Sequence, residues 1–323
     1  MNRYPLNFTW IISAGFLAEF AGITFILLLG NVEIYQRPGV TYAAMLAGLL
    51  LPGMFHAKVI DTFRRKHAYL LSMAVMLAGM YGCQTLDGAL RMASAALFGA
   101  GFGFVFSIGS ALHIDVSPSL LRNWNNVVYV SKTIFALMLA KLLVLCNLCY
   151  FDLPANAIMK IIYLSVFIGM VCMLFARIPF RAPIGVKLLG NDRFFLPGLW
   201  LPALHTALAG AFIGLTYIYA LYGGIPSMIW PAIGLLCSII TPVGQVEHAY
   251  LRRITHCQRD TAVTTLLVSF YTGILGYFVY YFQVGSEGRI QSNCADLLGA
   301  LLVLTLVEGW RGYKWFRYIN GYE

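Results

Sequence analysis

Long uninterrupted runs of hydrophobic residues dominate the chain, and short polar gaps separate them. Most runs are close to the roughly 20 residues that a helix needs to cross a bilayer core of about 30 Å. The pattern therefore predicts an all-α polytopic membrane protein of about ten transmembrane helices. The ten expected helices lie at 8–30, 40–59, 68–86, 90–113, 126–150, 158–177, 197–222, 225–244, 261–283 and 294–312.

Basic residues fill every second gap between these runs. Fifteen of the 22 Lys and Arg residues lie in one set of gaps and in the two termini, whereas four lie in the other set and three lie inside runs. Loops on the cytoplasmic side of a membrane carry the excess of Lys and Arg. Both termini are therefore predicted to be cytoplasmic, and the expected location is the cytoplasmic (inner) membrane, crossed many times.

Composition narrows the class of protein further. Of the 323 residues, 60% are hydrophobic and 11% are charged, against about 25% charged in soluble domains. The predicted inner face alone accounts for the net charge of +9, which attracts anionic membrane lipids rather than nucleic acid. The loops are too short to hold a soluble catalytic domain. We therefore expect no enzymatic activity and no cofactor.

One gap is longer than the others and divides the chain. It is basic, contains two prolines and two glycines, and has the character of a linker. We expect an N-terminal six-helix bundle at 1–177, a cytoplasmic linker at 178–196 and a C-terminal four-helix bundle at 197–323.

The inner gap after the second run carries an acid followed by a basic cluster, Asp61-Thr62-Phe63-Arg64-Arg65-Lys66. It resembles the hallmark of the major facilitator transporters between helices 2 and 3, a Gly and three spacers followed by Asp-Arg-x-Gly-Arg-Arg/Lys. Asp61, Arg65 and Lys66 match this pattern. Ala57 stands at the place of the Gly, and Thr62 and Arg64 replace the first Arg and the second Gly.

The fourth run and its flanks resemble the same family. Arg91, the glycine-rich segment 99–103, Asp115, Pro118 and Arg122 look like the succession found around helix 4 of these transporters. The small residues of this run also predict close packing against another helix.

The resemblance implies a facilitator-like bundle that moves a small solute by alternating access. The family has twelve helices, whereas the pattern here gives six and four, so we expect a homo-oligomer or a partner membrane protein to complete the bundle. An inner gating network would comprise Asp61, Arg64, Arg65, Lys66, Asp115 and Arg122. Ordinary positive charge at helix ends explains these residues equally well.

Ionisable residues inside a membrane span are costly and are functional candidates by default. Glu19 lies near the middle of the first run, and Lys132 and Lys141 lie in the fifth run. They are candidates for proton coupling or solute binding, and a structural Glu–Lys ion pair is an equal alternative. Between the two lysines, Lys141 is favoured to face a cavity because it lies farther from either surface.

His205 is a further candidate, because it lies well inside the seventh run. A hydrogen-bonded packing histidine is the alternative interpretation. His113 lies at the inner end of the fourth run, where solvation explains it. No histidine spacing indicates a metal site.

The most concrete function that the sequence supports is a secondary active transporter of a small solute, coupled to protons through Glu19. A second hypothesis is a membrane scaffold or assembly partner with the same fold and no transport. A third is a thiol or metal enzyme centred on Cys146 and Cys149, although cysteines in membrane helices are more often packing residues.

Overall fold

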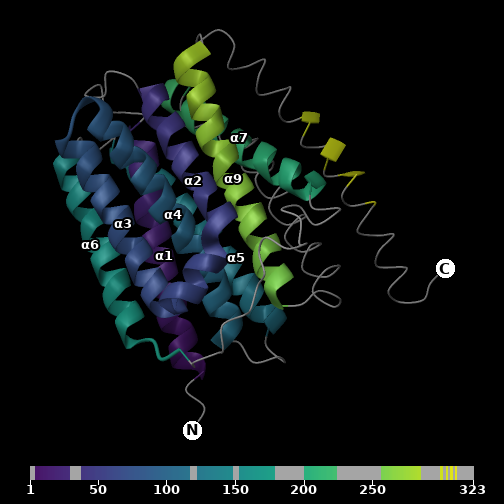
Figure 1. Cartoon of the computed structure of the whole chain (residues 1–323). Coiled ribbons are helices and arrows are strands. Elements are labelled where there is room, and N and C mark those ends of the chain that lie inside the picture. Colours follow the sequence, from purple (N-terminus) through teal and green to yellow (C-terminus); the bar gives the residue numbers. More distant parts are fainter. Residues whose placement is uncertain are drawn as a thin grey trace. The chain divides into compact units, whose positions relative to one another are not determined.

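The computed structural model describes eight helices and short pieces near the C-terminus. The described residues are 4–29, 38–116, 122–147, 153–178, 200–223, 256–284, 299–300, 303–304, 306–307 and 310. Figure 1 shows the helices and their labels, and the described part of the chain contains no strand. The helices are α1 (Tyr4–Leu29), α2 (Pro38–Phe63), α3 (Arg65–Thr85), α4 (Gly88–Val116), α5 (Arg122–Cys146), α6 (Ala155–Phe175), α7 (Trp200–Gly223) and α9 (His256–Val284).

These helices confirm the all-α prediction and coincide with the first seven and the ninth of the expected spans. The expected span at 225–244 lies outside the described residues, and so does most of the span at 294–312. Several helices extend a few residues beyond their apolar runs. In α2, for example, the helix continues into the polar end of the segment, because a helix does not have to stop where the hydrophobic core of the bilayer stops.

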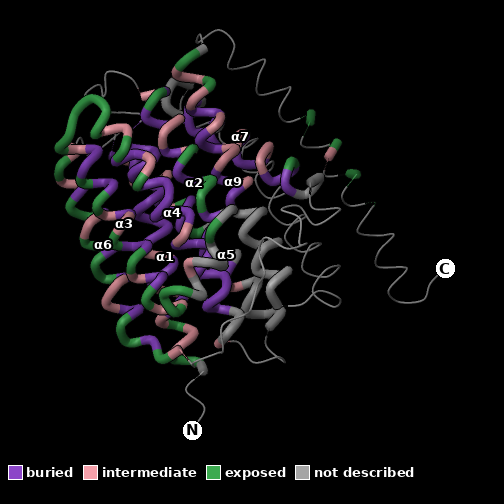
Figure 2. Tube along the Cα trace, viewed as in Figure 1, coloured by how far each residue is buried: buried purple, intermediate pink, exposed green. Residues whose placement is uncertain are grey.

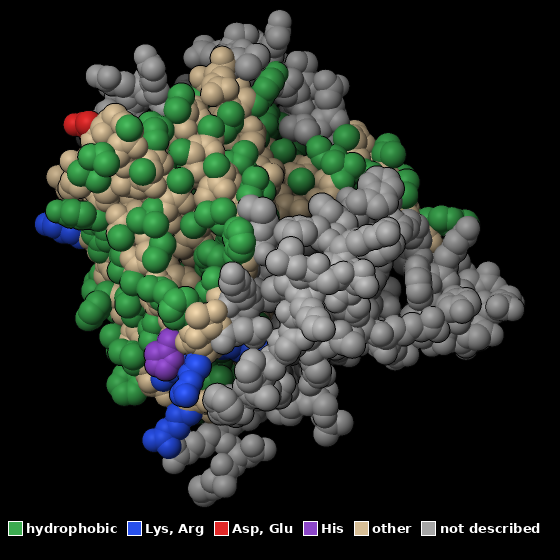
Figure 3. Space-filling model, in the orientation of Figure 1, with side chains coloured by type: hydrophobic (Ala, Val, Ile, Leu, Met, Phe, Trp, Pro, Cys, Tyr) green, Lys and Arg blue, Asp and Glu red, His purple; other side chains and the backbone are tan. Residues whose placement is uncertain are grey.

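Three of the described helices are long and apolar enough to cross a membrane by length and composition, at Pro5–Leu29, Gly88–His113 and Ala155–Phe175. The exposed face of α6 has the character of a membrane-spanning helix. Leu164 and Phe167 are 57% and 61% exposed, whereas Ser165, Gly169 and Cys172 are buried. Large apolar side chains on the outside and small residues inside suit a lipid environment. Figure 3 shows hydrophobic side chains spread over this face of the molecule, with Lys and Arg at its lower end and at its left edge.

The chain divides into two compact units, unit 1 (Met1–Val186) and unit 2 (Lys187–Glu323). In unit 1, α4 packs against both α2 and α3, and α1 packs against α4, α5 and α6. Figure 2 shows the buried residues running along the inward sides of these helices. In unit 2, α7 packs against α9. The predicted six-plus-four division stays a prediction, because the segment 179–199 lies outside the described residues.

Glycines set the closest helix contacts within each unit. In unit 1, a side chain at Gly99 of α4 would collide with the backbone of Met45, and one at Gly48 of α2 would collide with the backbone of Ala96. This reciprocal contact is the close packing that the small residues of the fourth run predict. In unit 2, Gly210 and Gly273 form the same kind of contact between α7 and α9. Backbones approach this closely only where no Cβ intervenes.

The acid–basic segment after α2 is a helix corner rather than a loop. Only Arg64 separates α2 from α3, and its φ of 56° reverses the chain in one residue. Asp61 therefore belongs to the last turn of α2, and Arg65 and Lys66 belong to the first turn of α3. The corner places the basic side chains of the motif at the end of unit 1 where these two helices meet.

Candidate functional site

The most unusual feature of unit 1 is an ion pair in its interior. Lys132 Nζ of α5 donates a hydrogen bond to Glu19 Oε1 of α1 over 2.5 Å. Glu19 is 1% exposed and Lys132 is 6% exposed. Each charge alone would be costly at this depth, and together they are neutral. The structure thus pairs Glu19 with Lys132, and not with Lys141.

Aromatic residues lie next to the ion pair. Lys132 Nζ lies 3.9 Å from the ring centroid of Tyr129, one helical turn earlier on α5. The Tyr129 hydroxyl donates to the carbonyl of Phe106 on α4, and the Tyr129 ring stacks on His113 with their centroids 4.2 Å apart. Tyr69 of α3 approaches from another side. The electron-rich face of Tyr129 therefore adds to the stabilisation of the Lys132 cation.

Gly15 makes room for this cluster. A Cβ at Gly15 would lie 3.0 Å from Lys132 Nζ and 3.6 Å from the Tyr69 hydroxyl. Gly15 lies one turn before Glu19 on α1, so the missing side chain leaves space where Lys132 and Tyr69 converge. A larger residue would push the ammonium group away from the carboxylate.

One carboxylate oxygen remains available for a proton. Glu19 Oε2 is buried and has no hydrogen-bond partner among the described residues, and the same holds for the Tyr69 hydroxyl. A buried carboxylate oxygen without a donor is costly, and protonation at Oε2 removes its negative charge. The pair therefore has the geometry to accept a proton at an oxygen that Lys132 does not occupy.

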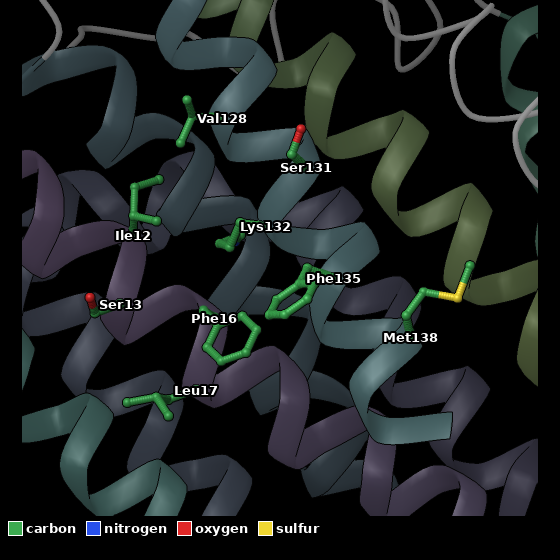
Figure 4. A pocket seen from close by; sticks show the side chains of 9 residues that line it. All are labelled: Ile12, Ser13, Phe16, Leu17, Val128, Ser131, Lys132, Phe135 and Met138. Carbon is green, nitrogen blue, oxygen red and sulfur yellow. The ribbon is translucent and has the colours of Figure 1, made fainter. Parts of the chain in front are cut away.

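A pocket of about 790 Å³ lies between α1 and α5, next to the ion pair (Figure 4). Phe16 and Phe135 extend toward each other across it, with ring centroids 5.7 Å apart and planes inclined by 25°. The pocket is mostly apolar, and its polar lining consists of two serines and Lys132. The lining residues are Ile12, Ser13, Phe16, Leu17, Val128, Ser131, Lys132, Phe135 and Met138.

The remaining membrane candidates lie at other positions on the described helices. Lys141 is half-buried, nine residues farther along α5. His205 is fully buried in α7 of unit 2, next to the buried Thr206. Cys146 is a half-buried free thiol at the end of α5, and Cys149 lies outside the described residues.

Of the expected inner gating residues, Lys66 has the clearest contacts. Its ammonium group donates to the carbonyl oxygens of Leu174 and Ala176 over 2.7 and 2.8 Å. These carbonyls lie at the C-terminal end of α6, where a cation offsets the helix dipole and satisfies acceptors that have no partner within the helix. Partial burial lowers the pKa of the Lys66 amine from its ordinary value.

The other gating candidates are placed only in part. Arg64 is exposed at the α2–α3 corner, and Arg65 is half-buried beside it. Asp61, Asp115 and Arg122 lie on helical backbone, but their side chains are outside the described part of the structure. The network that would join these six residues therefore stays a prediction.

Sequence reasoning missed the aromatic neighbours of the ion pair. The expectation that His113 is solvated is wrong, since this residue is 2% exposed and packed on Tyr129. The spacing of three residues between Tyr129 and Lys132 was an available signal, because it places both on one face of a helix. Nothing in the sequence indicates that Tyr69 of α3 reaches the same cluster.

Comparison with solved structures identifies the fold. The chain is similar to the human organic anion transporter MFSD10 (TETRAN), with a TM-score of 0.61 and 13% sequence identity over 95% of this chain and 100% of the other. It is also similar to FucP, a major facilitator superfamily transporter in the outward conformation, with a TM-score of 0.53 and 12% identity over 98% of this chain and 92% of the other. A variant of the E. coli fucose:proton symporter FucP gives a TM-score of 0.51 at 11% identity, with the same coverage.

No protein-family model matches the sequence, and no curated protein matches it. The likeness is therefore one of structure, and it confirms the expected resemblance at that level: the chain has the fold of the major facilitator transporters. Together with its apolar helices, this fold makes it a multi-pass membrane protein. Both of these similar structures are transporters.

Proposed function

We propose that this protein is a secondary active transporter that moves a small solute across the cytoplasmic membrane by alternating access, with proton coupling at Glu19. The observation that carries the proposal is the buried Glu19–Lys132 ion pair beside the α1–α5 pocket. The presence of the same fold in a proton symporter and in an organic anion transporter supports it.

Coupling requires two states that differ in their affinity for a proton. In the paired state, Lys132 neutralises the Glu19 carboxylate, and the low-dielectric interior opposes their separation. A proton on Glu19 Oε2 removes the negative charge and weakens the attraction to Lys132. Protonation therefore favours a state in which α1 and α5 are free to move relative to each other.

Other residues take supporting roles in this proposal. Lys141 and His205 are further candidates for contact with solute or proton in the transport cycle. The cap that Lys66 forms on α6 belongs to the inner end of unit 1, where a gating network with Asp61, Arg64, Arg65, Asp115 and Arg122 would open and close access from the cytoplasm.

Proteoliposomes that contain a pH-sensitive dye in the lumen test the proposal. A panel of sugars, amino acids, organic cations and organic anions is added outside, and the lumenal pH is followed. We expect at least one solute to change the lumenal pH only when the protein is present. In Glu19→Gln, the same solute should still exchange across the membrane, without the pH change.

Two results would contradict this account. Full pH-driven uptake in Glu19→Gln would remove Glu19 as the coupling site. A folded wild-type protein that moves no solute in the panel would favour the alternative, a non-transporting scaffold or assembly partner with this fold.

A further inference from the structure

The α1–α5 pocket has a chemical character that limits what it can bind. Most of its lining is apolar, and the Phe16 and Phe135 rings face each other across it. Its volume of about 790 Å³ lies in the range of pockets that hold small organic molecules. An apolar or aromatic body of that size would contact both rings (Figure 4). A sugar would leave its hydroxyl groups without partners here.

The polar lining of the pocket carries one sign of charge. Ser13 and Ser131 offer hydroxyl groups, Lys132 is the charged member, and no acidic side chain is among the described residues that line the pocket. The Lys132 ammonium is nine-tenths or more buried, so a ligand that reached it would be almost entirely out of water. A single buried cation at the end of an apolar pocket selects for an anion.

The partner of that cation is Glu19, which is the one acidic side chain among the buried residues that the structure describes. The buried titratable groups that the structure describes on the helices packed against α1 are Tyr69 and Cys83 of α3, His113 of α4, Tyr129 and Lys132 of α5, and Cys172 of α6. When Glu19 takes up a proton, Lys132 becomes a buried cation without a counter-ion. An anion in the pocket would then replace the charge that Glu19 has lost.

We propose that the pocket between α1 and α5 binds an organic anion with an apolar body, and that the acidic group of this ligand replaces the Glu19 carboxylate on Lys132. A proton on Glu19 and an anion on Lys132 then bind together, and the loaded site has the same net charge as the empty one. This inference rests on the proposed function and adds the class of its solute.

Calorimetric titration of the full-length protein in uncharged detergent tests the inference. The probe is 2-naphthalenesulfonate, whose charge does not change near neutral pH, and its matched neutral control is naphthalene-2-sulfonamide. In the wild type, we expect the sulfonate to bind more tightly as the pH falls and the sulfonamide to be indifferent to pH. Because a hydrogen bond to a charged group contributes measurably, Lys132→Met should weaken sulfonate binding about ten- to a hundredfold and leave sulfonamide binding unchanged.

Glu19→Gln should change the affinity for the sulfonate in the opposite direction. It therefore distinguishes the role of Glu19 as a competitor for Lys132 from the role of Lys132 as the anion ligand. Without a competing carboxylate, the sulfonate should bind at neutral pH more tightly than it binds the wild type, with no further dependence on pH. The double variant Glu19→Gln/Lys132→Met contains no buried charge at this position. It should fold and bind only the sulfonamide, so it serves as a control if either single variant unfolds.

The inference is overturned if the wild type binds sulfonate and sulfonamide equally, if Lys132→Met binds the sulfonate as tightly as the wild type, or if Glu19→Gln binds it more weakly. These results differ from a failure of the proposed function. If the protein carried a sugar or a cation together with protons, the proposed transport function would stand and the proposed anion site would be rejected. If the sulfonate and the sulfonamide bound as expected but no solute crossed the membrane of the vesicles, the anion site would stand and the proposed transport function would be rejected.

Discussion

Each partner of the Glu19–Lys132 pair is tolerated in the interior of unit 1 because the other is present. The two side chains are almost fully buried, and Tyr129 and Tyr69 shield them further. Removal of one partner leaves a buried charge without compensation, whereas removal of both leaves an apolar contact. The stability of the pair is thus a property of both residues together.

Single and double substitutions should therefore differ in a characteristic order. Glu19→Gln should lower the free energy of unfolding by about 3–5 kcal/mol, as for other broken buried pairs, whereas Glu19→Gln/Lys132→Met should lie close to the wild type. Thermal unfolding in detergent measures both. A double variant that is less stable than the single variant would show that the pair is not coupled.

Gly15 also supports the ion pair, because its missing side chain leaves the space that Lys132 occupies. Gly15→Val should displace the ammonium group, since even a Cβ there would lie 3.0 Å from Nζ. We expect it to weaken solute-dependent proton flux in proteoliposomes. Gly276→Val is a matched control in another helix, because no atom of the described residues lies within 4 Å of a Cβ at that position.

At the level of the helices, close contacts depend on glycines at defined positions. A Cβ at Gly273 of α9 would collide with the backbone of Ala207 on α7, whereas a Cβ at Gly276, one turn away, would meet no atom of the described residues within 4 Å. Both positions are helical, so alanine is favoured by helix propensity at both. An alanine at either position gains helix propensity, but only at Gly273 does it also disturb a helix contact. Comparing the two variants therefore isolates the effect of packing.

Gly273→Ala should destabilise unit 2 by about 1–3 kcal/mol, the usual cost of inserting atoms into a filled contact. Gly276→Ala should be neutral or slightly stabilising. The measurement is the midpoint temperature of thermal unfolding of each variant, compared with that of the wild type. Equal shifts for the two would mean that α7 and α9 do not pack as described.

Lys66 connects the start of α3 to the end of α6, and its loss should loosen that contact. Lys66→Met removes two hydrogen bonds to backbone carbonyls, each contributing about 1 kcal/mol. Lys160→Met removes an exposed lysine of α6 that makes no hydrogen bond or ion pair with the described residues, and it is the matched control. Hydrogen exchange at the C-terminal turn of α6 should rise in the first variant only. An equal rise in both would argue against the cap.

The sequence predicted elements better than it predicted contacts. Hydrophobic runs are local, so eight helices were placed to within a few residues. The Glu19–Lys132 pair joins residues 113 positions apart, and helix depth alone left Lys132 and Lys141 as competing partners. The rotation of each helix about its axis decides between them. That rotation depends on tertiary packing, at positions such as Gly15 and Gly99, and not on periodicity.

For the whole molecule, basic residues in every second gap predict which side of the membrane each gap faces. The fold alone does not test that orientation. Green fluorescent protein fused after Glu323 should fluoresce, because the C-terminus is predicted to be cytoplasmic. Alkaline phosphatase inserted after Asp152, in a predicted outer gap, should be active in intact cells, and the same insertion after Arg181 should be inactive. The reverse pattern of activity would show that the chain has the opposite orientation in the membrane.

The central claim is that the buried Glu19–Lys132 pair exchanges a proton and is not a fixed structural contact. Infrared difference spectroscopy of the full-length protein in lipid, between mildly alkaline and mildly acid pH, observes the carboxyl group directly. The account predicts that a C=O band of a protonated, water-shielded carboxyl group grows as the pH falls in the wild type and is missing in Glu19→Gln. A wild-type spectrum without that band, or an identical band in Glu19→Gln, would contradict it.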